Sequence, residues 1–280
     1  MIVDRKFTIL ALTCMFLFFS CSVTKTKQTN NKNVVENKST VPSQEHSIKA
    51  VLWQQTAGEY KALTYQAFNL AKLQLDKIIE VEKENEKPLA IITDIDETVL
   101  DNSPFFAKSI ELDEGFNKQR WMEWGKKVDA IPVPGALDFF KYAVSKNIEI
   151  FYISNRYDTQ LNETIENLYK TGFPVTNKQH VLLKTNSSEK QPRRDKVLEN
   201  YKVVMLLGDN LSDFLSAFRS DSIKERNQLV DDLKEEFGRR FIVFPNPVYG
   251  DWESHGIYKG KYDWSEVEKD SIRKSKLISY

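Results

Sequence analysis

Residues 89–98 read Leu-Ala-Ile-Ile-Thr-Asp-Ile-Asp-Glu-Thr, an apolar run that ends at two aspartates one residue apart. Four apolar residues in a row predict a strand that is buried on both faces, the usual state in a parallel sheet. Where the backbone turns beyond this strand, the carboxylates of Asp94 and Asp96 can converge on one small volume. Two adjacent anions repel each other and need a cation or a shared proton. The pattern therefore predicts a metal-dependent site that acts on phosphate.

Apolar strand patterns alternate with helical patterns along the folded part of the chain, which predicts a Rossmann-like α/β fold with a mostly parallel sheet and helices on both faces. Residues 102–133 have several aromatics and no clear strand, so we expect a small, mainly helical cap there. Polar clusters follow the strands, and in such sheets these strand ends share the ligand-binding edge. The strands are expected at residues 89–93, 148–154, 181–183, 202–207 and 240–244. The helices are expected at 47–86 (capped by Ser47, with Gly58 as a possible break), 135–145, 158–172, 213–219, 223–237 and part of 265–280.

Two polar clusters besides the first aspartate pair carry candidate site residues. Asp209 and Asp213 lie four residues apart across a strand-to-helix turn, and carboxylates are the hard ligands that Mg²⁺ prefers. Asp213 could equally be an acidic residue that favours the start of a helix. Ser154 and Asn155 could offer a hydroxyl and a backbone N–H to phosphate, although both residue types are also common in ordinary turns.

The order of these clusters resembles the four motifs of the haloacid dehalogenase (HAD) superfamily. More narrowly, residues 94–100 (Asp-Ile-Asp-Glu-Thr-Val-Leu) and 208–214 (Gly-Asp-Asn-Leu-Ser-Asp-Phe) resemble the paired signature of bacterial class C acid phosphatases, which are lipoprotein 5′-nucleotidases. The resemblance covers about residues 47–263. It implies a HAD fold and hydrolysis of phosphomonoesters, nucleoside monophosphates above all.

The resemblance also implies roles for the aspartates. Asp94 would attack phosphorus and form an aspartyl-phosphate, and Asp96 would protonate the leaving oxygen and then activate water. Mg²⁺ would be held by Asp94, by Asp209, by the backbone carbonyl of Asp96, and by Asp213 directly or through water.

A lysine is the third motif of the superfamily, and two lysines compete for it. Lys184 is nearer to the preceding strand, whereas Lys190 precedes Pro192 and the start of a charged helix. The motif context favours Lys190 as the residue that neutralises the phosphate and the nucleophile.

Two aromatics are candidates for substrate specificity. Trp121, in the cap, and Tyr249, in Pro-Asn-Pro-Val-Tyr-Gly at 245–250, could each stack on a flat base. Either could instead pack in the core, which is the usual role of an aromatic side chain.

The N-terminus predicts export. Residues 1–20 combine Arg5 and Lys6 with an apolar stretch that is too short for a comfortable membrane span, as in a signal peptide. Ser20-Cys21 resembles a bacterial lipobox, so we expect cleavage before Cys21 and lipid on its thiol; a plain signal peptide is the alternative. Residues 21–46 are polar and predict a flexible tether. We expect residues 47–280 to form the phosphatase domain, anchored in the cell envelope of a Gram-negative bacterium, in the outer membrane.

The charge balance limits the partners. The chain has 40 Lys and Arg against 40 Asp and Glu, so its formal net charge is zero and long nucleic acid is not an expected partner. The three histidines match neither a catalytic pair nor a zinc cluster. A broad phosphatase for sugar or aryl phosphates is one alternative to a nucleotidase, and a surface binding lipoprotein, such as an adhesin or haem binder on an inert phosphatase fold, is another. A homodimer is left open.

Overall fold

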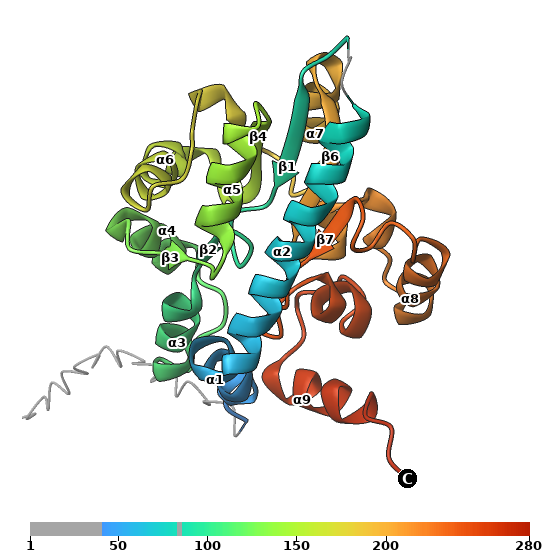
Figure 1. The fold of residues 1–280 in the computed structure, drawn as a ribbon. Coiled ribbons are helices and arrows are strands. Elements are labelled where there is room, and N and C mark those ends of the chain that lie inside the picture. The colour runs from blue at the N-terminus through green and yellow to red at the C-terminus, as the bar shows by residue number, and fades with distance from the viewer. Residues whose placement is uncertain (1–40, 83–85) are drawn as a thin grey trace, which may run out of the picture. The chain divides into compact units, whose positions relative to one another are not determined.

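The computed structural model describes residues 41–82 and 86–280, so the predicted signal peptide and the predicted lipidation site Cys21 lie outside the described residues. A five-stranded sheet in the order β5-β4-β1-β6-β7 forms the centre of the fold (Figure 1), and all of its pairings are parallel. The predicted α/β class and parallel sheet are therefore confirmed. The strands are β1 (Leu89–Thr93), β4 (Glu149–Tyr157), β5 (Val181–Lys184), β6 (Lys202–Gly208) and β7 (Phe241–Val243).

β1 lies in the middle of the sheet, as its apolar sequence requires. Ala90 to Thr93 pair with β4 on one side, and the whole strand pairs with β6 on the other. Ala90 and Ile91 are fully buried because helices cover both faces. Since every strand runs in the same direction, the segments that follow β1, β4 and β6 meet at one edge.

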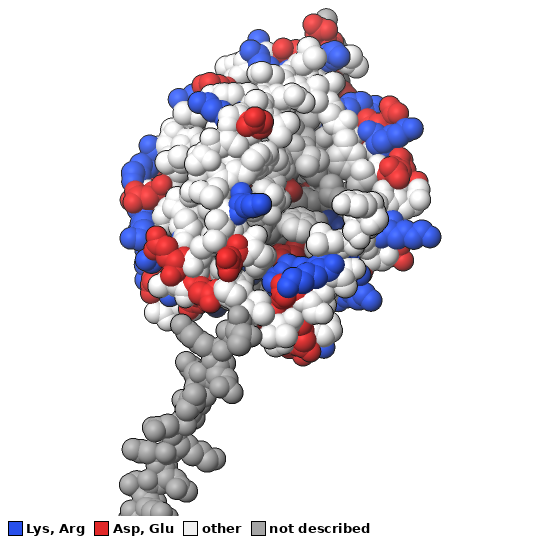
Figure 2. Space-filling model, turned by 90° about the horizontal axis from the view of Figure 1, so that it is seen from below, with Lys and Arg blue, Asp and Glu red and all other residues white. Residues whose placement is uncertain are grey.

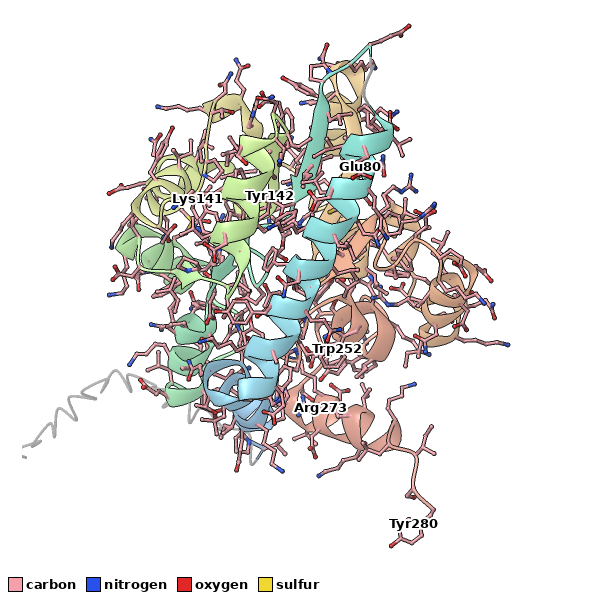
Figure 3. All side chains as sticks on the ribbon, viewed as in Figure 1. Glu80, Lys141, Tyr142, Trp252, Arg273 and Tyr280 are labelled. Carbon is pink, nitrogen blue, oxygen red and sulfur yellow. The ribbon has the colours of Figure 1, made fainter. Side chains whose placement is uncertain are left out.

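Helices from different parts of the chain cover the two faces of the sheet (Figure 1). The larger core lies under α2 (Gly58–Val81), α5 (Ala136–Ser145) and α6 (Leu161–Lys170), with Phe68, Phe140 and Leu168 buried in it. α5 is also tied to α2 by a hydrogen bond from the hydroxyl of Tyr142, labelled in Figure 3, to Asp76. On the opposite face, α7 (Gln191–Asn200) packs Val197 against Ile92 and Ile153.

The start of the folded part agrees with the prediction at Gly58 and differs from it at Ser47 and in the extent of the tether. Residues 47–86 form two helices, α1 (Ile48–Thr56) and α2, because Ala57 is extended (φ −78°, ψ 127°), so the possible break at Gly58 is confirmed. Ser47 makes no side-chain capping bond. The predicted tether also ends earlier than residue 46, because the backbone N–H groups of Ser43 and Gln44 donate to Asp113 at 2.6 and 3.1 Å.

Two further segments surround the carboxyl edge of the sheet. The cap region holds α3 (Ser103–Glu111), α4 (Lys118–Lys127) and a small antiparallel pair, β2 (Leu100–Asp101) with β3 (Ile131–Pro132), that the sequence did not predict. After β6, the expected helix 213–219 is two 3₁₀ turns, Leu211–Asp213 and Ser216–Phe218. The chain then forms α8 (Ile223–Asp232), a π-helical segment (Trp252–Ile257) and α9 (Glu266–Ser275). In the described part of the chain, no helix has both the length and the apolar character needed to cross a membrane.

Candidate active site

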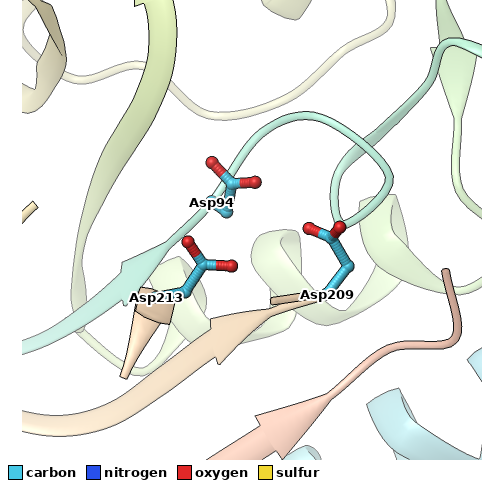
Figure 4. Close-up of side chains that lie close together, drawn as sticks. All are labelled: Asp94, Asp209 and Asp213. Carbon is cyan, nitrogen blue, oxygen red and sulfur yellow. The ribbon is translucent and has the colours of Figure 1, made fainter. Parts of the chain in front are cut away.

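Three aspartates converge at the carboxyl edge of the sheet. Asp94 follows β1, Asp209 follows β6, and Asp213 ends the 3₁₀ turn beyond β6; Figure 4 shows their carboxylates facing a common space. One carboxylate oxygen from each lies within 4.8 Å of the others. Burial, reinforced by Asp213, raises the pKa of Asp209 to about 7. This crowding of buried anions is the electrostatic state that a bound cation relieves.

Lys190 supplies one positive charge to this cluster. Its Nζ lies 2.5 Å from Oδ1 of Asp94 and 2.6 Å from Oδ1 of Asp213, and the residue is 6 % exposed. Burial lowers the pKa of Lys190, but Asp213 and Asp94 outweigh burial and leave it above its usual value. The competing Lys184 instead places its Nζ 4.1 Å from the centre of the Tyr157 ring. The structure therefore brings Lys190, and not Lys184, to the predicted nucleophile.

Asp96 lies in a dense hydrogen-bond network. Its Oδ2 accepts from the hydroxyl of Ser154 at 2.9 Å, and its Oδ1 accepts from Nδ2 of Asn102 at 2.9 Å. Arg156 adds an ion pair to the same Oδ1 at 2.8–2.9 Å while only 2 % exposed. These contacts fix the orientation of the predicted acid/base.

Asp209 is also oriented by side chains from other segments. Thr98, four residues after the nucleophile, donates to Oδ1 at 3.1 Å, and Asn246 after β7 donates to Oδ2 at 2.8 Å. Asp213 accepts from the backbone N–H of Asn210 at 3.0 Å. The predicted helix-start role of Asp213 thus coexists with its place in the carboxylate cluster.

Ser154 and Asn155 occupy different positions. Ser154 is fully buried, and its hydroxyl is engaged with Asp96 and with the backbone N–H of Arg156, so its predicted phosphate contact finds no support in this geometry. Asn155 lines the cavity that also contains Asp94, Asp209 and Asp213. Its Oδ1 accepts from Nη2 of Arg193 at 2.7 Å. Arg193 also donates to the carbonyl of Ser154 at 2.6 Å and so fixes this loop.

Two adjoining cavities lie at this edge. The catalytic cavity, of about 190 Å³, contains the three converging aspartates, Lys190 and Asn155. A second cavity of about 270 Å³ shares Tyr249 and Tyr262 with it. From below the view of Figure 1, the surface is hollowed between rims that carry both basic and acidic side chains (Figure 2). The second cavity is also bounded by α9, whose Arg273, labelled in Figure 3, donates to the hydroxyl of Tyr258 at 2.9 Å.

The two predicted stacking residues have different surroundings. Tyr249 lies in the walls of both cavities. Trp121 is 8 % exposed and packs edge-on against Phe105 at 5.0 Å, outside the linings of both, so its contacts are those of a core aromatic. Phe116, which the sequence analysis did not single out, is 67 % exposed and lines the second cavity. An aromatic next to charged residues in the cap was its only sequence signal.

Three polar residues of the site were also missed. Asn102 bonds Asp96, Asn246 bonds Asp209, and Glu97 is fully buried beside them. Asn246 follows a predicted strand, which is the one signal that could have identified it. Glu97 lies inside the signature at residues 94–100, which did not by itself indicate a role, and nothing local distinguishes Asn102 from an ordinary loop residue.

Comparisons with known proteins agree with this geometry. A family model described as HAD superfamily, subfamily IIIB (acid phosphatase), matches residues 15–252. The class C acid phosphatase from Bacillus anthracis has a similar structure, with a TM-score of 0.81 and 45% identity over 86% of this chain and 100% of that chain; the same values hold for its tungstate-bound form. Stem 31 kDa glycoprotein from Glycine max is 28% identical over 70% of this chain and 69% of its own length. Acid phosphatase 1 from Solanum lycopersicum is 24% identical over 64% and 68%.

A buried carboxylate cluster with a lysine at the carboxyl edge of a parallel sheet defines a phosphomonoesterase of the HAD type. The chain belongs to the acid phosphatases of HAD subfamily IIIB. The predicted family, fold and enzyme class are therefore confirmed, and the alternative of an inert binding lipoprotein loses its support.

Proposed function

We propose that this acid phosphatase hydrolyses nucleoside monophosphates through an aspartyl-phosphate on Asp94, with Mg²⁺ as its metal, at the cell envelope. The observation that carries the proposal is the pairing of a carboxylate-lined cavity with an aromatic-lined one through the shared side chains of Tyr249 and Tyr262. A nucleotide has the matching two parts, an anionic phosphate and a flat apolar base.

The donor set fits Mg²⁺. Asp94, Asp209 and Asp213 present only oxygen ligands, which suit a hard divalent ion, and phosphatases of this superfamily usually use a divalent metal. Burial raises the pKa of Asp94 and of Asp209, a cost that a cation in this space would remove. The backbone carbonyl of Asp96 is a further candidate ligand. When bound, the ion would reduce repulsion between the nucleophile and the phosphate and share transition-state charge.

The residues of the chain divide the chemistry between them. An oxygen of Asp94 forms a bond to phosphorus as the bond to the leaving oxygen breaks, and Asp96 gives its proton to that oxygen. Asp96 then takes a proton from water, whose oxygen attacks phosphorus and releases Asp94. Lys190 holds Asp94 in position and balances negative charge. Arg156 lies 2.8 Å from Asp96 and keeps its carboxyl group oriented for both steps.

The second cavity supports a ring-bearing leaving group. Phe106 and Tyr249 lie with ring centres 5.0 Å apart and planes at 32°, and Phe116 exposes its ring to the same cavity. Stacking on such rings tolerates different bases. A broad phosphatase for aryl or sugar phosphates remains the competing candidate, because any flat ring could use the same surface.

Assays on the full chain, purified in detergent, test this proposal. We expect Mg²⁺-dependent, EDTA-sensitive phosphate release that is faster from nucleoside monophosphates than from methyl phosphate. Tungstate, a tetrahedral oxyanion found bound in the Bacillus anthracis relative, should inhibit competitively. Asp94→Asn is the matched inactive control. Phosphate release that does not depend on a metal would refute the proposed role of Mg²⁺. Equal rates for all leaving groups would refute the proposed preference for nucleotides.

The location at the envelope rests on residues 1–21 alone. We propose that lipid on Cys21 anchors the enzyme in the outer membrane and that the polar residues after it act as a tether. Mass spectrometry of the membrane-extracted protein should show a lipidated N-terminal peptide beginning at Cys21. Cys21→Ser should move the activity from the membrane fraction to the soluble fraction, and unchanged fractionation would refute the anchor.

A further inference from the structure

Glu97 adopts a backbone conformation that is unusual for its residue type. Its φ is +60°, in the left-handed region that non-glycine residues seldom adopt, and it is fully buried. Its backbone N–H donates to the carbonyl of Leu100 at 2.8 Å, which closes the tight turn after Asp96. Strained residues of this kind persist where the surrounding structure holds them, often beside functional groups.

Both carboxylate oxygens of Glu97 have partners. Oε1 accepts from the backbone N–H of Asn102 at 2.8 Å, and Oε2 accepts from the hydroxyl of Tyr249. Glu97 lines neither cavity, so it is placed to act through these two residues rather than on the substrate.

The two partners belong to different parts of the site. Tyr249 lines both the catalytic cavity and the second cavity, which is the proposed binding site for the ring of the substrate. Asn102 donates from Nδ2 to Asp96 at 2.9 Å and accepts from Nε1 of Trp124 at 2.8 Å, which fixes its amide. Glu97 therefore links Tyr249, which lines the second cavity, to Asn102, which holds Asp96.

Tyr249 depends on this contact for its orientation. Its backbone N–H donates to Oδ1 of Asn246 at 3.3 Å and its ring packs against Phe106. Neither of these contacts involves the hydroxyl group. In the described part of the chain, the hydroxyl has Glu97 as its hydrogen-bond partner.

We infer that Glu97 is a positioning residue that holds the ring of Tyr249 against the leaving group and, through Asn102, keeps Asp96 aligned with the same group. It couples recognition of the ring to protonation of the leaving oxygen. The inference rests on the proposed function only in that the leaving group carries a ring.

A double-mutant cycle tests the coupling. Glu97→Gln, Tyr249→Phe and the double variant are compared with the unmodified protein on p-nitrophenyl phosphate, a nucleoside monophosphate and methyl phosphate. We expect each single variant to raise KM for the two ring-bearing substrates about 5- to 20-fold, with a much smaller change for methyl phosphate. The KM of the double variant should be no higher than the KM of the more impaired single variant, because both changes remove the same bond. Effects of the two changes that multiply would overturn the inference.

A control variant and a comparison of substrates distinguish a specific role of Glu97 from a general effect of mutation and from a failure of the proposed substrate. Tyr169→Phe, which removes a hydroxyl bonded to the carbonyl of Val175 at 2.9 Å on α6, should leave all three KM values unchanged. Should Glu97→Gln not fold, an unchanged KM of Tyr249→Phe for ring-bearing substrates still overturns the inference from the other end of the bond. If the unmodified enzyme does not prefer nucleotides to methyl phosphate, the proposed substrate fails, whereas the cycle on p-nitrophenyl phosphate still decides the role of Glu97.

Discussion

The Nζ atom of Lys190 lies 2.5 Å from Oδ1 of Asp94, although 96 residues separate them along the chain. The contact forms because β1 and the start of α7 meet at the same edge of the sheet. One ammonium here faces two buried carboxylates, since Asp213 also pairs with it at 2.6 Å. The cluster thus keeps a net negative charge that favours a further cation.

Removal of this ammonium should abolish most of the activity. We expect Lys190→Met to lower kcat by about 10²–10³-fold, as is usual when a charge stabiliser is removed from an active site. It should also destabilise the metal-free protein, by about 3–5 kcal/mol, because two buried carboxylates lose their partner. Lys184→Met is the matched control and should behave like the unmodified enzyme in kinetics and in urea unfolding. Loss of activity in Lys184→Met alone would reverse the assignment of the motif lysine.

Metal binding should appear as stability. Mg²⁺ at about 100 times its Kd should raise the free energy of unfolding by about 2.7 kcal/mol, because it neutralises Asp94, Asp209 and Asp213 in the folded state only. Calorimetry with Mg²⁺ and with EDTA measures the difference in Tm. Asp209→Asn should remove most of the Mg²⁺-dependent increase. An equal increase in that variant would show that the ion binds elsewhere.

Arg156 should matter for both stability and rate. Arg156→Gln leaves the carboxylate of Asp96 without its buried ion pair, so we expect a loss of about 3 kcal/mol in the free energy of unfolding together with a lower kcat. The exposed pair of Arg239 with Glu236, at 2.6 Å, offers the control. Arg239→Gln should change the free energy of unfolding by less than about 0.5 kcal/mol. Equal losses in the two variants would contradict the importance of burial.

Phe116 and Trp121 should separate recognition from packing. Phe116→Ala should lower the ratio of kcat/KM for nucleotides over methyl phosphate with little loss of stability, because the ring is largely exposed. Trp121→Ala should cost about 3–5 kcal/mol of stability, as for other buried aromatics, and leave that ratio unchanged. Kinetics and chemical denaturation on the same two preparations decide between them. The reverse pattern would restore Trp121 as the stacking residue.

His180 should make stability depend on pH. Burial lowers the pKa of its imidazole below the usual value, although Glu149 opposes this shift. Above the unfolded pKa of about 6.5 the contribution of the neutral ring is fully present. As the pH falls below it, the unfolded chain binds a proton that the folded chain resists, so stability is lost. His180→Gln should therefore lose less stability than the unmodified protein between pH 7.5 and 5.5. A steeper loss in the variant would contradict this sign.

The strands were predictable because burial on both faces leaves an unbroken apolar sequence. β1 begins and ends where the apolar run does, and Asp94 and Asp209 follow their strands because parallel strands end at one edge. The break at Gly58 could be predicted from the glycine, but the two short 3₁₀ turns after β6 could not, because helical periodicity alone does not set helix ends.

The side-chain network of the site could not be predicted in the same way. The bond between Glu97 and Tyr249 joins residues 152 positions apart, so no local pattern carries it. The burial of Trp121 and the engagement of the Ser154 hydroxyl with Asp96 likewise depend on which distant elements pack nearby. Sequence motifs identified Ser154, Trp121 and Tyr249 as candidates, but tertiary contacts decided their roles.

The wall of the second cavity includes Ser43, Gln44 and His46. About 22 residues separate Ser43 from Cys21, and an extended chain gains at most about 3.6 Å per residue, so an anchored enzyme would keep this cavity within roughly 80 Å of the bilayer. Hydrolysis would then occur in a thin layer at the membrane, and its capacity would scale with membrane area rather than compartment volume. Nucleosides would be released beside the bilayer that transporters occupy, before diffusion dilutes them.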